Sequence, residues 1–175
     1  MSAISPVLIL IGPPGAGKST IGAAMAQRLG VDFLDTDAAI EAAAGRSISD
    51  IFVDDGEGAF RQMELEAVLD ALDHHPGVVS LGGGAVMTPG ITQALERAQH
   101  TGTVTFLNVG IADAASRVGF DASRPMLVIN PRASWNRLMN ARRPTYERLA
   151  HLQIDTAGRD VPDICAEIQS AMSAQ

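Results

Sequence analysis

The residues best suited to chemistry in this sequence lie between positions 12 and 20, where the chain reads Gly-Pro-Pro-Gly-Ala-Gly-Lys-Ser-Thr. Their spacing matches G-x-x-x-x-G-K-S, a glycine-rich loop whose backbone N–H groups surround phosphate oxygens. Lys18 is the only lysine among 13 lysines and arginines, and its compact ammonium fits between phosphates where a planar guanidinium is too wide. We therefore predict a nucleotide-phosphate site formed by Gly15, Ala16, Gly17, Lys18, Ser19 and Thr20, with the Ser19 hydroxyl on Mg²⁺.

Two acidic residues form a second group of candidate ligands. Asp35 and Asp37 follow an apolar segment at 32–34 that we predict to be a strand. If the strand continues, both carboxylates lie on the same side of it, where they could bind Mg²⁺ and recognise a hydroxyl group. Alternatively, Asp37 only caps a helix that begins near Ala38. The third predicted strand, 78–81, has no acidic residue at its end, which favours Asp35 as the carboxylate that serves the metal.

Three consecutive glycines follow the third predicted strand, at 82–84. Such a run is entropically costly unless the backbone approaches another group closely or adopts positive φ. We predict that its N–H groups face a small polar substrate.

Arg61 and Glu64 are three positions apart on a predicted helix and can face each other. Taken alone, an ion pair at this spacing is usually exposed and contributes little to stability.

Several arginines lie in the second half of the chain. Arg124 sits in a segment with little periodicity that a glycine and a proline bracket, which predicts a lid over about 117–130. An arginine on a lid can meet the charge of a transferring phosphoryl group once the nucleotide is bound. Arg142 and Arg143 add further positive charge to a chain whose net charge is −7.

The elements that must position these residues alternate along the chain. Short apolar runs predict five strands, at 7–11, 32–34, 78–81, 103–107 and 151–154. Helical spacing predicts helices at 19–29, 37–44, 47–53, 58–74, 88–99, 111–118, 133–150 and 161–174. Strands that alternate with helices imply an α/β domain in three layers, with a parallel sheet covered on both faces. Ligands then gather at the carboxyl ends of the strands.

Composition bounds the class of protein. The 175 residues are most simply one domain, spanning 1–175. No apolar run approaches the length of a membrane span, and the amino-terminal residues lack the charged region of a signal peptide. The single cysteine, Cys165, cannot form an internal disulfide, which agrees with the cytoplasm. The negative net charge argues against a broad nucleic-acid surface.

Taken together, these motifs resemble the shikimate kinase family, and the match extends along nearly the whole chain. After the loop at 12–20 and the acid pair come Gly45-Arg46-Ser47-Ile48-Ser49-Asp50-Ile51-Phe52, Gly56-Glu57 with Phe60-Arg61, Gly82-Gly83-Gly84, Arg117, Arg124-Pro125-Met126-Leu127 and Arg142-Arg143-Pro144-Thr145-Tyr146. The resemblance implies a P-loop NTPase fold of the nucleoside monophosphate kinase type, with five parallel strands in the order 2-3-1-4-5. It also implies phosphoryl transfer from ATP, with one Mg²⁺, to the 3-hydroxyl of shikimate in aromatic amino-acid biosynthesis.

The resemblance further implies roles in phosphoryl transfer and metal binding. Lys18 and Arg124 would stabilise the transferring phosphoryl group. Ser19, with Asp35 acting mainly through water, would hold Mg²⁺. Asp37 would accept hydrogen bonds from shikimate hydroxyls and orient or deprotonate the one that attacks.

The remaining roles concern the two substrates. Arg61, positioned by Glu64, and Arg142 would bind the shikimate carboxylate, although Arg143 adjoins Arg142 and could take its place. Gly83 and Gly84 would offer backbone donors to shikimate. Nucleotide contacts would come from Arg117, against the adenine, and from the turn that contains Arg159. The substrate-binding region would cover about 35–64, and we expect a cytoplasmic monomer.

Other functions remain as alternatives. A related small-molecule kinase such as a gluconate kinase is the nearest, because both substrates carry a carboxylate and hydroxyls. An adenylate-type kinase usually has Gly-Lys-Gly-Thr where this chain has Gly-Lys-Ser-Thr. A regulatory GTPase needs an Asn-Lys-x-Asp motif, which a chain without a second lysine does not have. A non-catalytic nucleotide-binding module is disfavoured because every expected catalytic position is filled.

Overall fold

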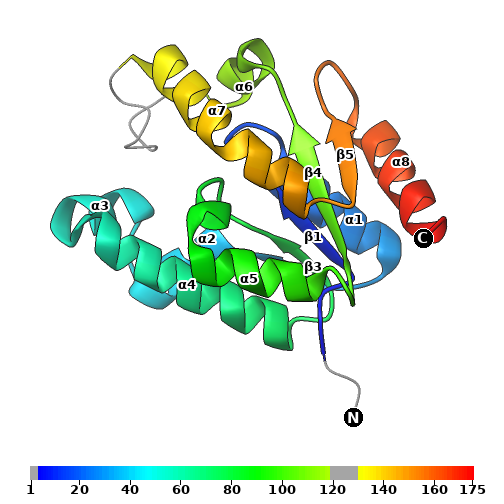
Figure 1. Ribbon diagram of the computed structural model, residues 1–175, viewed down its shortest axis with the longest axis horizontal. Coiled ribbons are helices and arrows are strands. Elements are labelled where there is room, and N and C mark those ends of the chain that lie inside the picture. The colour runs from blue at the N-terminus through cyan, green and yellow to red at the C-terminus, as the bar shows by residue number, and fades with distance from the viewer. Residues whose placement is uncertain (1–3, 119–129) are drawn as a thin grey trace.

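The computed structural model describes residues 4–118 and 130–175. Five parallel strands form one sheet in the order β2-β3-β1-β4-β5 (Figure 1), which confirms the predicted order. The strands are β1 (Leu8–Ile11), β2 (Phe33–Asp35), β3 (Val78–Ser80), β4 (Thr103–Asn108) and β5 (Leu152–Asp155). Every residue of β1 and β3 is buried, as expected for strands that have helices on both faces.

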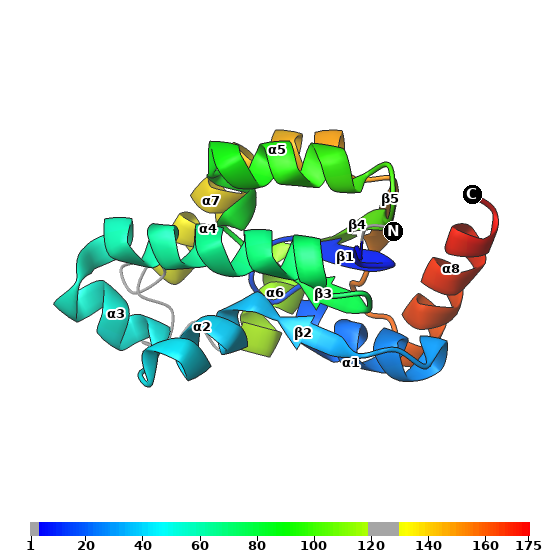
Figure 2. The same cartoon turned by 90° about the horizontal axis from the view of Figure 1, so that it is seen from below.

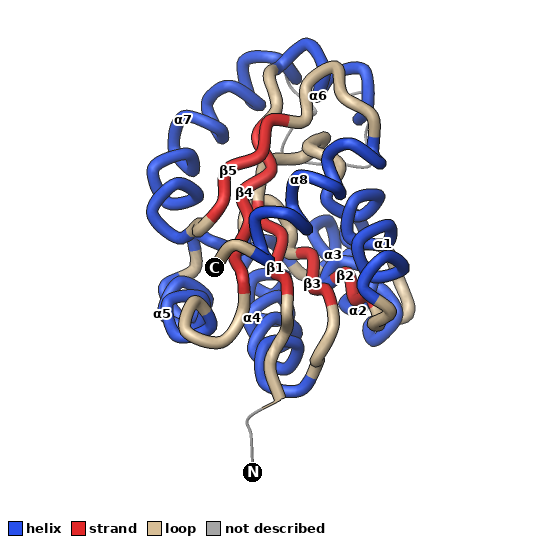
Figure 3. Tube along the Cα trace, turned by 90° about the vertical axis from the view of Figure 1, so that its right-hand side faces the viewer, coloured by secondary structure: helices blue, strands red, loops and turns tan. Residues whose placement is uncertain are grey.

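Helices cover both faces of the sheet, which gives the predicted three layers (Figure 2). One face carries α1 (Lys18–Leu29) and α8 (Val161–Ser173), and the other carries α4 (Gly56–His74), α5 (Pro89–Ala98) and α7 (Pro131–Leu149). Figure 3 shows the strands between these two groups. Shorter helices lie at the carboxyl ends of the strands: α2 (Thr36–Ala44), α3 (Ile48–Asp54) and α6 (Ile111–Val118). A 3₁₀ turn, η1 (Ala85–Met87), was not predicted.

Two apolar clusters hold these layers together. The larger one combines the strands with the inner faces of the flanking helices. The smaller one contains Ile40 of α2, Ile51 of α3 and Phe60 of α4, all at most 5% exposed. The helix α4 belongs to both clusters, because its second half packs against the sheet through Val68 and Leu72.

The start of α2 differs from the sequence prediction. The strand β2 ends at Asp35, and the helix begins at Thr36 instead of continuing as strand to Asp37. Asp35 Oδ1 accepts hydrogen bonds from the backbone N–H groups of Asp37 (2.9 Å) and Ala38 (3.2 Å). The helix cap is therefore Asp35 and not Asp37, so strand alternation does not bring the two carboxylates together.

The helix α7 begins two residues earlier than predicted, at Pro131. Proline suits the first turn of a helix because its fixed φ is helical and its missing N–H would have no partner there. Asn130 precedes it as the cap, and its side-chain oxygen accepts from Ala133 N at 3.4 Å. A second proline, Pro144, lies inside the helix on an exposed position.

Candidate active site

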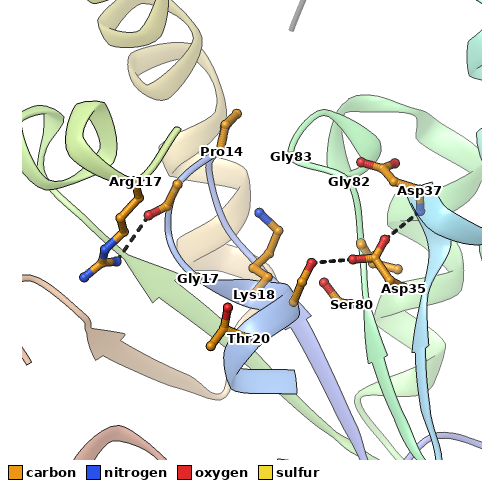
Figure 4. Close-up of a pocket in the computed structure, with 13 residues that line it drawn as sticks. Pro14, Gly17, Lys18, Thr20, Asp35, Asp37, Ser80, Gly82, Gly83 and Arg117 are labelled. Carbon is orange, nitrogen blue, oxygen red and sulfur yellow. Dashed lines mark hydrogen bonds between the residues drawn. The ribbon is translucent and has the colours of Figure 1, made fainter. Parts of the chain in front are cut away.

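A cavity of about 430 Å³ opens at the carboxyl ends of β1, β2 and β3. At β1 the strand order reverses direction, since β3 lies on one side of it and β4 on the other. Such a switch point leaves a crevice where α/β proteins bind ligands. The cavity is lined by Pro14, Gly15, Gly17, Lys18, Ser19, Thr20, Asp35, Asp37, Ser80, Leu81, Gly82, Gly83 and Arg117 (Figure 4).

The predicted phosphate loop joins β1 to α1 on one side of this cavity. Gly17, with φ 90°, is the cap of α1, and this left-handed backbone conformation favours glycine. Because glycine has no side chain to cover the helix start, the first turn presents its backbone N–H groups and the positive end of its dipole. Lys18 Nζ donates to the carbonyl oxygens of Gly12 (2.8 Å) and Pro13 (2.9 Å). The loop thus concentrates donors for an anion.

The two predicted metal ligands lie together. Ser19 Oγ is 2.5 Å from Asp35 Oδ2, while the other oxygen of Asp35 caps α2. A hydroxyl and a carboxylate oxygen suit Mg²⁺, which binds through one or two protein oxygens while keeping several waters. No larger cluster of histidine, cysteine or acidic side chains that could hold a metal occurs in residues 4–118 and 130–175. The pair therefore fits a nucleotide-bound Mg²⁺ and not a metal cage made by the protein alone.

Asp37 lies across the cavity from Lys18 (Figure 4). Its carboxylate is half-buried in the first turn of α2 and lies over the glycine loop that follows β3. A Cβ atom on Gly82 would be 2.7 Å from Asp37 Oδ1 and 2.9 Å from Glu64 Oε2. A larger residue at position 82 would force these two carboxylates to move, which favours glycine there.

Two guanidinium groups converge over Gly84. A Cβ atom there would be 2.8 Å from Arg61 Nη1 and Nη2 and 3.0 Å from Arg142 Nη2. Between them, Glu64 is 1% exposed and accepts from Arg61 Nη1 at 2.7 Å. Burial raises the pKa of Glu64, while the charges of Arg61 and Arg142 oppose that rise. Arg61 also contacts the exposed Glu57, with Nε 3.4 Å from Oε1. Two planar guanidiniums that converge in this way suit a further carboxylate.

The side chains of Arg142 and Arg143 diverge. Arg142 is 5% exposed and faces the glycine loop. Arg143 instead donates to Asn108 Oδ1 at 3.1 Å, and its guanidinium lies 5.9 Å from the ring centre of Phe106. The sequence left the choice between the two arginines open, and this geometry favours Arg142.

Arg117 joins the phosphate loop to the turn after β5. Its Nη1 donates to the carbonyl oxygens of Gly15 (3.2 Å) and Ala16 (3.3 Å), and its Nη2 donates to Thr156 O at 2.7 Å. In the same turn, Arg159 Nη1 donates to Asp155 O at 2.9 Å. The turn and Arg117 therefore lie together beside the loop, as expected for a nucleotide base site.

Some sequence predictions fall outside the described residues, and some neighbours of the site were missed. Arg124 and most of the predicted lid lie within 119–129, which the structure does not describe. Trp135, Tyr146 and Thr156 contact the site loops through hydrogen bonds, although no role was predicted for them. A polar side chain two residues after the strand predicted at 151–154 was the available signal for Thr156.

Comparison with known proteins gives a consistent result over the whole chain. The family model described as shikimate kinase matches residues 14–173. A shikimate kinase from Thermobifida fusca is 52% identical over 163 residues, which cover 93% of this chain and 92% of that protein. A shikimate kinase from Salinispora arenicola is 45% identical over 171 residues, with 98% of this chain and 100% of that protein covered.

Solved structures agree with the sequence comparison. The structure of shikimate kinase from Acinetobacter baumannii in complex with shikimate has a TM-score of 0.91 and 31% identity, covering 98% of this chain and 94% of that chain. A gluconokinase from Sinorhizobium meliloti has a TM-score of 0.62 at 17% identity, over 99% of this chain and 94% of that chain. The second likeness concerns the fold alone.

Proposed function

The chain belongs to the shikimate kinase family, and from that membership we propose how its residues transfer a phosphoryl group from ATP to the 3-hydroxyl of shikimate. The enzyme is an ATP-dependent phosphotransferase that acts on an alcohol. In the reaction the 3-hydroxyl oxygen attacks the γ-phosphorus, the bond to ADP breaks, and the hydroxyl loses its proton. The product, shikimate 3-phosphate, feeds aromatic amino-acid biosynthesis.

The nucleotide occupies the loop from Gly15 to Thr20. Backbone N–H groups of the loop and the dipole of α1 bind the phosphates, and Lys18 leaves the loop carbonyls to meet β- and γ-phosphate oxygens. Arg117 lies against the adenine, and the turn of Arg159 covers the other side. Arg124 contacts the transferring phosphoryl group from the lid, where it stabilises charge that develops in the transition state.

Ser19 and Asp35 would hold the Mg²⁺ that accompanies ATP. Their adjacent oxygens, 2.5 Å apart, support this assignment. When bound, the ion neutralises charge on the phosphates. Asp35 contributes mainly through water, because one of its oxygens already caps α2.

Asp37 receives the proton of the attacking hydroxyl. Its position across the cavity from Lys18 supports this role (Figure 4), since the hydroxyl must lie between the carboxylate and the γ-phosphate. Gly83 and Gly84 present backbone N–H groups to the other polar atoms of shikimate.

The substrate carboxylate binds where Arg61 and Arg142 converge over Gly84. This convergence is the observation that carries the assignment of shikimate, because two guanidiniums that meet at one point can together bind one carboxylate. A planar guanidinium matches a carboxylate with two parallel hydrogen bonds. Glu64 keeps Arg61 in place for this contact.

A coupled assay of ADP release tests the function. We expect release that depends on both Mg²⁺ and shikimate, and no comparable stimulation by gluconate or AMP, because the relatives that are 45–52% identical to this chain are shikimate kinases. We expect Arg61→Gln to raise the KM for shikimate. The matched control is Arg97→Gln, the same change on α5. Stimulation by gluconate alone would remove shikimate as the substrate.

We also propose that the enzyme acts as a monomer in the cytoplasm. In the described parts of the chain no helix is long and apolar enough to cross a bilayer. The buried Cys165 is the sole cysteine, which supports a reducing compartment. The exposed large apolar side chains of the described residues fall on three separate segments, with Ile4 and Val7 before β1, Val53 on α3 and Met87 in η1. This separation supports a monomer, and light scattering after gel filtration measures the oligomeric state directly.

A further inference from the structure

Side chains hold the carbonyl groups of the phosphate loop from residue 12 to residue 16. Lys18 donates to the first two carbonyls, of Gly12 and Pro13. The other three carbonyls accept hydrogen bonds from outside the loop, and the donors come from α6, α7 and the turn after β5. The donors are Arg117, Trp135 and Thr156.

Trp135 reaches the loop from α7. Its indole Nε1 donates to Pro14 O at 3.1 Å, across 121 positions of the chain. The side chain is only 3% exposed, so its N–H group is held in place by packing. An indole nitrogen can donate but cannot accept, which makes the direction of this bond unambiguous.

Thr156 reaches the loop from the other side, and it is fully buried. Its hydroxyl is 3.1 Å from Ala16 O and 3.1 Å from Asn108 O, and it accepts from Arg117 Nη1 at 3.0 Å. The hydroxyl has one proton to donate. Asn108 O already receives the backbone N–H of Thr156 at 2.9 Å. Ala16 O receives Arg117 Nη1 at 3.3 Å as well, so the Thr156 hydroxyl is the nearer of its two donors.

The orientation of these carbonyls determines the orientation of the next N–H groups. In a trans peptide the C=O and the following N–H point in opposite directions, and the described residues contain no cis peptide. Fixing Pro14 O therefore directs Gly15 N–H, and fixing Ala16 O directs Gly17 N–H. Both glycines line the cavity. The N–H between them, of Ala16, bonds instead to Pro13 O at 3.2 Å.

We propose that Trp135 and Thr156 are positioning residues for ATP, which hold the carbonyls of Pro14 and Ala16 so that the N–H groups of Gly15 and Gly17 point at the phosphates. This inference rests on the proposed nucleotide role of the loop. Amides oriented in advance bind an anion without a cost for ordering them. Neither side chain has to touch the nucleotide.

Two variants test the proposal with the full-length enzyme. Thr156→Val keeps the shape of the buried side chain and removes the hydroxyl, and Trp135→Phe keeps a ring and removes the N–H. The measurements are the KM for ATP, the KM for shikimate, and the inhibition constant of inorganic tripolyphosphate as a competitor of ATP. For each variant we expect the ATP and tripolyphosphate values to rise by the same factor, roughly fivefold, with the shikimate KM unchanged.

Tripolyphosphate separates the loop from the adenine site, because it has no base. If Thr156→Val weakens ATP but not tripolyphosphate, Thr156 acts through Arg117 and the adenine turn, and the proposal is wrong. Equal losses for ATP and shikimate would indicate a general structural defect and would also overturn it. Thr103→Val is the matched control: this threonine is 7% exposed at the opposite end of β4, and all three constants should stay unchanged. If tripolyphosphate does not compete with ATP in the parent enzyme, the nucleotide role of the loop itself fails.

Discussion

Asp37 is the residue of the site whose proposed role, acceptance of the hydroxyl proton, can be tested by one substitution. We expect Asp37→Asn to lower kcat by about 10²- to 10⁴-fold, because the amide keeps the size of the carboxylate but cannot take the proton of the 3-hydroxyl. The affinity for ADP, measured by calorimetry, should not change. Asp32→Asn, the same change at an exposed position before β2, is the control. A variant of Asp37 with nearly normal kcat would exclude it from the chemical step.

The phenol of Tyr146 is a buried group whose protonation can be followed by varying the pH. It is fully buried, stacks on Phe106 with ring centres 5.0 Å apart, and its hydroxyl donates to Gly83 O at 2.5 Å. Burial raises the pKa of Tyr146 to about 12, although the charge of Arg142 opposes the rise. The phenol therefore stays protonated, and keeps its hydrogen bond to the glycine loop, at every pH where the enzyme would be assayed.

This raised pKa predicts a loss of stability in alkali. Below the unfolded pKa of about 10 the stabilisation is complete, and it falls as the pH rises toward the folded pKa, by up to ~1.4 kcal/mol per pH unit. We expect denaturant unfolding to give a free-energy difference between the parent and Tyr146→Phe that shrinks above about pH 10. A difference that stays constant up to pH 12 would show that the phenol is not held protonated by folding.

At the scale of the elements, the long helix α7 joins the two halves of the site. Trp135 holds the phosphate loop, while Arg142 and Tyr146, seven and eleven positions further, hold the substrate side. A Cβ atom on Gly83 would be 3.0 Å from Pro14 Cδ and 3.3 Å from Arg142 Nη1, so the two loops meet beside this helix. One face of one helix therefore sets the distance between the phosphoryl donor and its acceptor.

The sequence predicted the strand and helix order well, because short apolar runs and glycines separate the elements clearly. The prediction was wrong at the start of α2, where Asp35 both ends β2 and caps the helix. Which aspartate caps the helix depends on hydrogen bonds that form only in the folded chain. The phosphate loop and the acid pair could also be predicted from the sequence, because each is a pattern of near neighbours; their roles stay predictions. Trp135 and Thr156 were not predicted, because their bonds to the loop span 121 and 140 positions and leave no local pattern.

At the scale of the whole molecule, we propose that residues 1–175 form one domain whose substrate-binding region, about 35–64, has a separate apolar cluster. Ile40, Ile51 and Phe60 form that cluster, which is separate from the main core, and α4 carries residues of both. Burying three such side chains contributes far less free energy than the core around the sheet. We therefore expect the proposed substrate-binding region to be the less stable part of the fold.

Hydrogen exchange measures this difference directly. We expect amides of α2 and α3 to exchange more than about tenfold faster than those of β1, because local opening costs less there. Added shikimate should slow exchange in α2 and α3. Exchange in α8, on the opposite side of the sheet, should not change and serves as the internal control. Protection of α2 and α3 equal to that of β1 would contradict the separate cluster.

The sole tryptophan and the sole tyrosine of the chain touch the two loops of the active site, Trp135 at the carbonyl of Pro14 and Tyr146 at that of Gly83. The near-ultraviolet spectrum of the enzyme therefore comes almost entirely from two chromophores, one at each of these loops. Emission from the indole reports on the nucleotide side, and absorption by the phenol reports on the shikimate side. The order in which the two substrates arrive can be followed by light alone, without a label on the protein.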